Sequence, residues 1–162
     1  MFFEERDPIA LHTVVAAAHQ ILTDLGKKKG VASALKDNAY LNEKQRRELR
    51  SNVLKAPNFF KHADRDPEAT LEFNPETTPF LIFDAILMYG LLSDSILAQA
   101  PIFLGWFYVN CPEAVEDDSG HPLLREMFKS AREMRLAFDN SSLTDEQKWK
   151  LHKVAALARL PT

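Results

Sequence analysis

The segment from Asn58 to Pro75 gathers more chemically capable side chains than any other stretch of this chain. His62 could act as a general base, because a neutral imidazole accepts a proton near physiological pH. Asp64 and Asp66 follow it, and either carboxylate could orient the imidazole. No Ser or Cys nucleophile lies nearby in the sequence to complete a triad. We therefore keep these three residues as catalytic candidates, although a histidine at a helix end more often interacts with the last carbonyls.

The alternation of acidic residues in this segment also has the form of a calcium loop. With Asp64 at position 1, Asp66 and Glu68 would follow at the positions that supply oxygen ligands. Position 6 of this loop must be Gly and position 12 a bidentate Glu, but Ala69 and Pro75 stand there. We predict no metal site in this segment and expect its carboxylates to cap turns and face water.

A second set of chemically capable residues is expected in the core. Asp84 is the one charged residue in the apolar stretch Phe80–Leu92, where a carboxylate is costly unless it is paired. His12 and His19 lie seven residues apart on one helix face, ~10.5 Å along the axis, so one zinc cannot bind both. We predict that Asp84 is hydrogen-bonded to a buried His, Arg, Tyr or backbone group. A metal or catalytic role for Asp84 with the two histidines is the alternative.

Charge is segregated between residues 42–62, which are mainly basic, and residues 63–76, which are mainly acidic. The basic segment could hold phosphates. Its candidate binding residues are Lys44, Arg46, Arg47, Arg50 and Lys61. It lacks a glycine-rich phosphate loop and an aromatic residue before Phe59, and the chain's net charge is −3. We therefore expect helix and loop to compensate each other, and we do not expect nucleic acid as a partner.

Composition indicates an ordinary globular protein, with 46% hydrophobic and 27% charged residues. Cys111 is the only cysteine, so an intrachain disulfide is excluded and a reducing cytosol is favoured. The acidic start does not match a secretory signal. The longest apolar stretch is well short of the ~20 residues that span a bilayer. We predict a cytoplasmic protein with no membrane contact, no cofactor and no metal.

Capping residues, glycines and prolines in the sequence predict where helices begin and end. Asp7-Pro8 has the form of an N-cap followed by the first helical position, and Gly26 would end that helix before a basic loop over 27–30. Capping boxes at residues 42–45 and 144–147 would open two more helices. Pro57 would kink the first of these or start a new helix near Phe59-Phe60, which we expect to anchor the following loop in the core. Short extended pieces remain open at residues 70–73 and 79–83.

Two further segments are apolar nearly all round, as buried helices are. They lie at residues 79–92, opened by Thr78 as N-cap and Pro79, and at 102–111. A strongly periodic helix follows from Pro122. We predict an all-α fold, with residues 1–162 as a single-domain bundle of about six helices around a buried central hairpin at about 79–111.

Two resemblances bear on function. Arg6 to His12 resembles the Arg-polar-His pattern of ribonucleases of the HEPN class, which implies nucleolytic activity. Chance alone produces about one such match in a chain of this composition, and Pro8 interrupts it, so we do not transfer the activity. The run NFFKHADRDP is similar to segments of small uncharacterised bacterial proteins, a resemblance that implies no activity.

The leading functional hypothesis is a bacterial binding or interaction module without catalysis, which could work as a homo-oligomer. It rests on the lack of a recognisable cofactor loop, nucleophile pair or metal-ligand spacing. Phe2-Phe3 at the start would then be an apolar patch that a partner covers. One alternative is a HEPN-like or metal-dependent hydrolase or nuclease, using His62 with Asp64 and Asp66, or His12 and His19 with Asp84. The other is nucleic-acid binding through residues 42–62.

Overall fold

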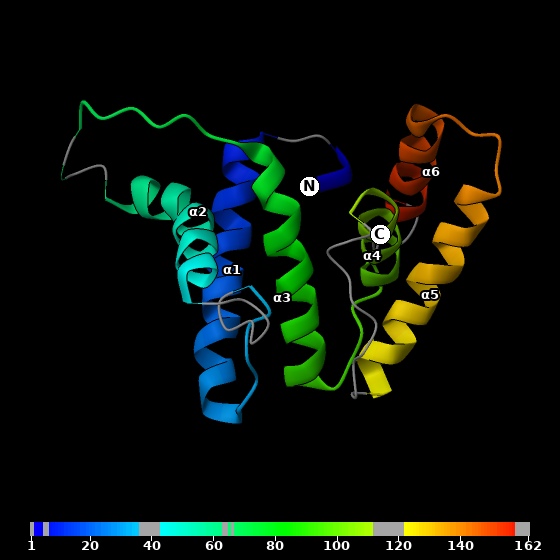
Figure 1. Cartoon of the computed structure of the whole chain (residues 1–162), viewed down its shortest axis with the longest axis horizontal. Coiled ribbons are helices and arrows are strands. Elements are labelled where there is room, and N and C mark those ends of the chain that lie inside the picture. Colours follow the sequence, from blue (N-terminus) through cyan, green and yellow to red (C-terminus); the bar gives the residue numbers. More distant parts are fainter. Residues whose placement is uncertain are drawn as a thin grey trace. The chain divides into compact units, whose positions relative to one another are not determined.

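The computed structural model describes the backbone of residues 2–4, 7–35, 43–62, 65, 67–111 and 122–157 (Figure 1). These ranges hold six α-helices, two 3-10 helices and no strand, so the all-α class is confirmed. The elements are η1 (Phe2–Glu4), α1 (Pro8–Lys29), α2 (Glu43–Lys61), η2 (Pro75–Thr77), α3 (Thr78–Ser93), α4 (Ala100–Asn110), α5 (Pro122–Asp139) and α6 (Asp145–Leu157). Residues 70–73 have no regular structure and residues 79–83 are helical, which settles the two open strand alternatives.

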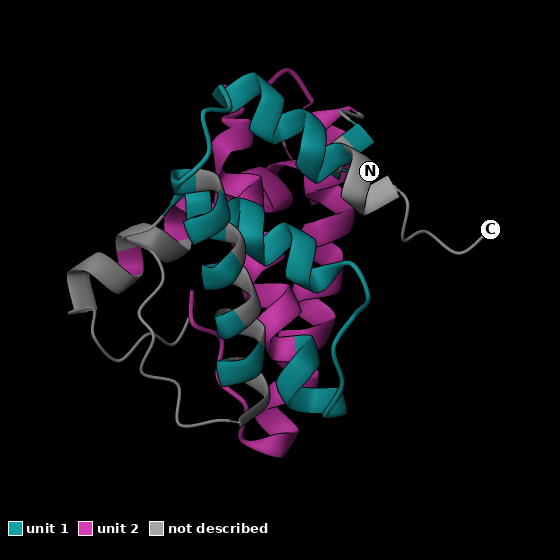
Figure 2. Ribbon diagram, turned by 90° about the vertical axis from the view of Figure 1, so that its right-hand side faces the viewer, with its two compact units in different colours: residues 1–4, 89–162 teal, residues 5–88 magenta. Residues whose placement is uncertain are grey.

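The chain divides into two compact units (Figure 2). Residues 5–88 form the unit that contains α1, α2, η2 and most of α3. Residues 1–4 and 89–162 form the other, with η1, α4, α5 and α6. The two apolar segments are helices, α3 and α4, as the sequence predicts. Their pairing as a central hairpin, like the single-domain organisation, stays a prediction.

Helix α1 begins where the sequence predicts and ends four residues later than predicted. The Asp7 Oδ1 atom accepts hydrogen bonds from the backbone N–H groups of Ile9 and Ala10, at 2.8 and 3.1 Å. The helix passes through Gly26 and ends at Gly30, whose φ of +72° is the left-handed conformation that glycine favours. The basic loop expected at 27–30 is therefore the last helical turn, where lysines complement the helix dipole.

Gly26 lies where α1 packs closely against the segment that follows it and against α3. A Cβ atom at this position would lie 2.5 Å from the Val31 carbonyl oxygen and 3.0 Å from the Met88 Cε atom. Gly26→Ala should therefore lower the free energy of unfolding by about 1–3 kcal/mol, measured by urea denaturation, because the backbone must shift. In an open helix the same change raises stability by about 1 kcal/mol.

Gly30 offers the matched control for this prediction. Nothing lies within 4 Å of a Cβ atom at Gly30, so Gly30→Ala loses only its left-handed conformation, a cost of about 1 kcal/mol. A Gly26→Ala protein that is more stable than the wild type would contradict the close approach.

Helices α1 and α3 run in the same direction (Figure 1). Three contacts follow one another along the two helices in the same order, which is what parallel helices require. They join His12 to Thr78, His19 to Asp84, and Gly26 to Met88. Parallel helices need a long return connection, and α2 lies within it. The apolar side chains at the centre of this unit come from all three helices and the segment after α1: Val15, Ala16, Leu35, Val53 and Leu81.

Helix α2 continues through Pro57 to Lys61, which excludes a new helix near Phe59, whereas the alternative, a kink at Pro57, stays a prediction. Asn42 and the side chains of the capping box proposed at its start lie outside the described part of the chain. Phe59 and Phe60 are half-buried, and the Phe60 ring lies 6.1 Å from that of Phe73 in the following loop. Phe73 in turn meets the His12 ring edge-on at 5.1 Å. This chain of rings ties the end of α2 and the loop to α1, as the anchoring prediction for Phe60 requires.

The other unit is centred on α4, whose side chains Ile102, Leu104 and Phe107 are at most 1% exposed. Phe2 packs edge-on against Phe103, Trp106 and Trp149, with ring centroids 4.8–5.7 Å apart. The expectation that Phe2 is an exposed residue for a partner to cover is therefore wrong, because aromatic rings of its own unit pack against it. The side chain of Phe3 is not among those described.

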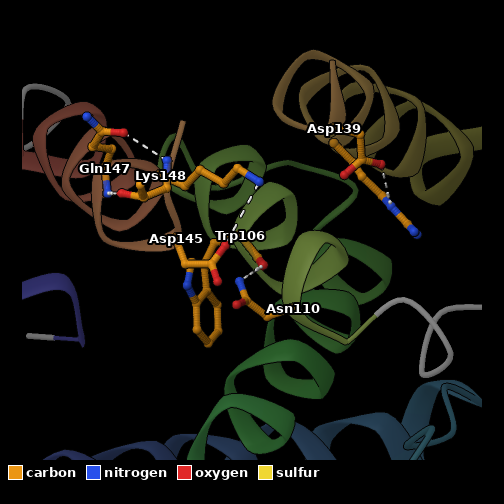
Figure 3. A network of polar contacts seen from close by, with 8 residues as sticks. Trp106, Asn110, Asp139, Asp145, Gln147 and Lys148 are labelled. Atoms are coloured by element: carbon orange, nitrogen blue, oxygen red, sulfur yellow. Dashed lines mark hydrogen bonds and ion pairs between the residues drawn. The ribbon is translucent and has the colours of Figure 1, made fainter. Parts of the chain in front are cut away.

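Local hydrogen bonds define the helix ends of this unit (Figure 3). At the start of α6 the Thr144 N–H donates to Gln147 Oε1 at 2.8 Å, and the Gln147 N–H donates to Thr144 Oγ1 at 3.3 Å. The predicted capping box is thus confirmed. At the end of α4, Asn110 Nδ2 donates to the Trp106 carbonyl at 2.7 Å.

Candidate functional site

The most concentrated polar cluster in the described part of the chain surrounds Asp84, which is completely buried. Its Oδ2 atom lies 2.5 Å from His19 Nε2 and accepts a hydrogen bond from Ser33 Oγ at 2.5 Å. Its Oδ1 atom accepts from the Ala34 backbone N–H at 2.8 Å. Asp84 is therefore hydrogen-bonded to a buried histidine and to a backbone group, as the sequence predicts, whereas a catalytic or metal role for it stays a prediction.

Three elements position this cluster. His19 projects from the buried face of α1, and Asp84 from the parallel helix α3. The left-handed cap at Gly30 turns the chain, so that Ser33 and Ala34 return to the carboxylate. Neither of these residues is predicted from the sequence. The available signal was local: a small polar residue just after a glycine cap is well placed to turn inward, but nothing in the sequence names its acceptor.

The order of hydrogen bonds decides what this cluster can do chemically. In a nucleophilic triad the serine bonds to the imidazole, which removes its proton, and the carboxylate orients the imidazole from the far side. Here both Ser33 and His19 bond to the carboxylate of Asp84. All three side chains are at most 1% exposed, so a substrate has no route to them in this structure. The arrangement satisfies buried polar groups and fixes α1, α3 and the segment after α1 together.

His12 forms a separate contact and does not share Asp84. Its Nδ1 atom lies 2.9 Å from the Thr78 hydroxyl. Thr78, expected as an N-cap, is assigned as the first residue of α3, and its hydroxyl is used in this contact. Burial lowers the pKa of His12, because the charged imidazolium loses its hydration. Its Nε2 atom is buried and has no hydrogen-bond partner in the described part of the chain. The proposed trio of His12, His19 and Asp84 is thus two separate contacts, about two helical turns apart along α1.

No described side chain completes a site around His62. This residue follows the last turn of α2 and its side chain is exposed. Its backbone N–H donates to the Phe59 carbonyl at 3.3 Å, and its carbonyl accepts from the Arg65 N–H at 3.0 Å. Asp64 and Asp66, its candidate partners, lie outside the described residues, so their catalytic role stays a prediction.

The basic helix carries one described surface feature. Arg47, Ser51, Leu54, Lys55 and Asn58 line an open groove of about 360 Å³ along α2. Lys61 is exposed at the end of the helix, whereas the side chains of the other candidates, Lys44, Arg46 and Arg50, lie outside the described part. The two cations and two neutral polar groups of this groove could bind an anionic group, but the groove is open and its described lining comes from α2 alone.

No group of three or more His, Cys, Asp or Glu side chains that could hold a metal ion occurs among the described residues. None of the helices in those residues is both long enough and apolar enough to cross a membrane. Comparison with protein-family models, with curated proteins and with solved structures finds no match to this chain.

Proposed function

We propose that this protein acts by binding another protein through the outer face of helix α1, without catalysis of its own. One observation carries the proposal: α1 exposes Val14, Ile21 and Leu25, which are 54%, 62% and 47% accessible. Scattered apolar residues are normal on a surface, but these three lie on the same side of one helix. A row of apolar side chains on a helix is the feature that helix-recognising partners bind.

The polar cluster around Asp84 supports a binding role over the hydrolase alternative. Its histidine and carboxylate are the best candidates for proton transfer in the described residues, and both are buried. His62, the exposed histidine, belongs to the surface end of α2. The described geometry gives less support to the nucleic-acid alternative, because the groove along α2 is open and its described lining holds two cations. We propose the bacterial cytoplasm as the place of action, in line with a single cysteine.

Site-specific photo-crosslinking tests the proposal. The photoreactive residue p-benzoylphenylalanine, placed at exposed Ala17 on α1, should yield a covalent protein adduct when irradiated in the cells that make the protein. The same residue placed at exposed Glu146 on α6 is the matched control and should yield none. Adduct formation at both positions, or at neither, would contradict a role for the α1 face.

A further inference from the structure

The outer face of α1 forms a continuous stripe along the whole helix. At 3.6 residues per turn its members fall within an arc of about 100°, opposite the buried His12, Ala16 and His19. Every member is exposed. In chain order the stripe consists of Asp7, Ala10, Val14, Ala17, Ala18, Ile21, Leu25 and Lys28.

The stripe is complementary to itself when its direction is reversed. If a second copy of α1 is laid antiparallel, with the two-fold axis between positions 17 and 18, large and small side chains match along the helix. The four facing pairs in this register are Asp7 with Lys28, Ala10 with Leu25, Val14 with Ile21, and Ala17 with Ala18. Alanines at the centre let the helix axes approach to the lower end of the usual 8–10 Å, and β-branched side chains pack on either side.

Charge and periodicity support the same register. Asp7 stands at one end of the stripe and Lys28 at the other, so opposite charges meet at both ends of an antiparallel pair and like charges meet in a parallel one. The stripe positions of Ala10, Val14 and Ala17 are repeated eleven residues later, where Ile21, Leu25 and Lys28 stand. An eleven-residue period is close to the natural turn of a helix, so two straight helices stay in contact over the ~33 Å of α1.

We propose that the partner of the α1 face is a second copy of this chain, bound antiparallel with Val14 opposite Ile21. This inference rests on the proposed binding role of α1 and names its partner. A two-fold contact is isologous, which requires a self-complementary surface, and the reversed stripe has that property. One helix from each copy makes a small interface, so a weak, reversible dimer is expected.

Light scattering coupled to size-exclusion chromatography, at protein concentrations up to ~0.2 mM, measures the association. The wild type should approach the mass of a dimer at the upper end. Ile21→Asp should raise the dissociation constant at least ~10-fold, because each copy would place a carboxylate against Val14. Ile21 is 62% exposed, so the folded chain tolerates the change. Leu151→Asp, at a position 48% exposed on α6, is the matched control and should leave the dimer intact.

Disulfide trapping tests the direction and register. In a Cys111→Ser background, Val14→Cys and Ile21→Cys are made as separate proteins. The two cysteines face each other only across mixed dimers, since like positions stand ~10.5 Å apart along the axis, too far for a disulfide. Oxidation should cross-link the mixture and neither protein alone. Cross-linking of each protein with itself would indicate a parallel pair and overturn the inference.

A monomer at every concentration would also overturn the inference, and so would a dimer that survives Ile21→Asp. If the chain is monomeric but the photoreactive residue at Ala17 still captures a different protein, only self-association fails. If the monomer captures nothing, the proposed function fails with it. Binding of the monomer to lipid vesicles that Ile21→Asp abolishes would assign the face to a membrane and likewise count against a second copy.

Discussion

Asp84→Ala should lower the free energy of unfolding by about 3–5 kcal/mol, the cost of breaking a buried polar pair from one side. The change removes the acceptor for Ser33, His19 and the Ala34 N–H at once, and leaves the Ser33 and His19 side chains buried without it. Urea denaturation followed by circular dichroism measures the loss. Whole domains are stable by only about 5–15 kcal/mol, so the variant should sit close to its unfolding threshold at room temperature.

Asp24→Ala is the matched control, because it removes a carboxylate from the surface of the same unit. Asp24 lies 3.0 Å from Lys27 Nζ, and both side chains are more than half exposed. Exposed ion pairs contribute about 0–1 kcal/mol, so this variant should unfold within that range of the wild type. Equal effects of the two substitutions would show that the Asp84 cluster does not hold α1 to α3.

The second large effect is a loss of stability in mild acid, caused by His152. Burial lowers the pKa of His152 to about 4, whereas an unfolded chain titrates near ~6.5. Above that value the imidazole is neutral in both states. As the pH falls below ~6.5, His152 binds a proton in the unfolded state but stays neutral in the folded state. The free energy of unfolding therefore falls until the folded state is also protonated, near pH 4. The full loss is about 3 kcal/mol.

The measurement is the free energy of unfolding of wild type and His152→Gln at several pH values between 7 and 4. The difference between the two proteins should change by about 3 kcal/mol across this window. His62→Gln, which removes an exposed histidine, is the control variant. A pH dependence that His152→Gln leaves unaltered would rule out His152 as its source. His12, whose pKa burial also lowers, acts in the same direction and remains in every variant.

Local signals in the sequence were sufficient for most helix boundaries. Asp7-Pro8 and Thr144 to Gln147 have short-range hydrogen-bond partners, so residue type and spacing alone identify them. Gly26 shows where this reasoning fails. A glycine after an apolar run is typical of a helix end, but here it serves the approach of Val31 and Met88, which no pattern within α1 reveals. At Pro57 the sequence leaves a kink and a new helix open, and only the structure excludes the new helix, since α2 continues to Lys61.

In the candidate site too, some features follow from the local sequence and others only from tertiary contacts. The sequence by itself determined that Asp84 needs a partner, because a carboxylate among apolar side chains is unstable alone. It also determined that His12 and His19 share one face of α1, because helical periodicity is local. Only the tertiary structure decided that His19 takes Asp84 while His12 takes Thr78, and that Ser33 and Ala34 complete the shell. Those choices depend on the parallel register of α1 and α3, which contacts between residues more than 60 positions apart establish and no local pattern encodes.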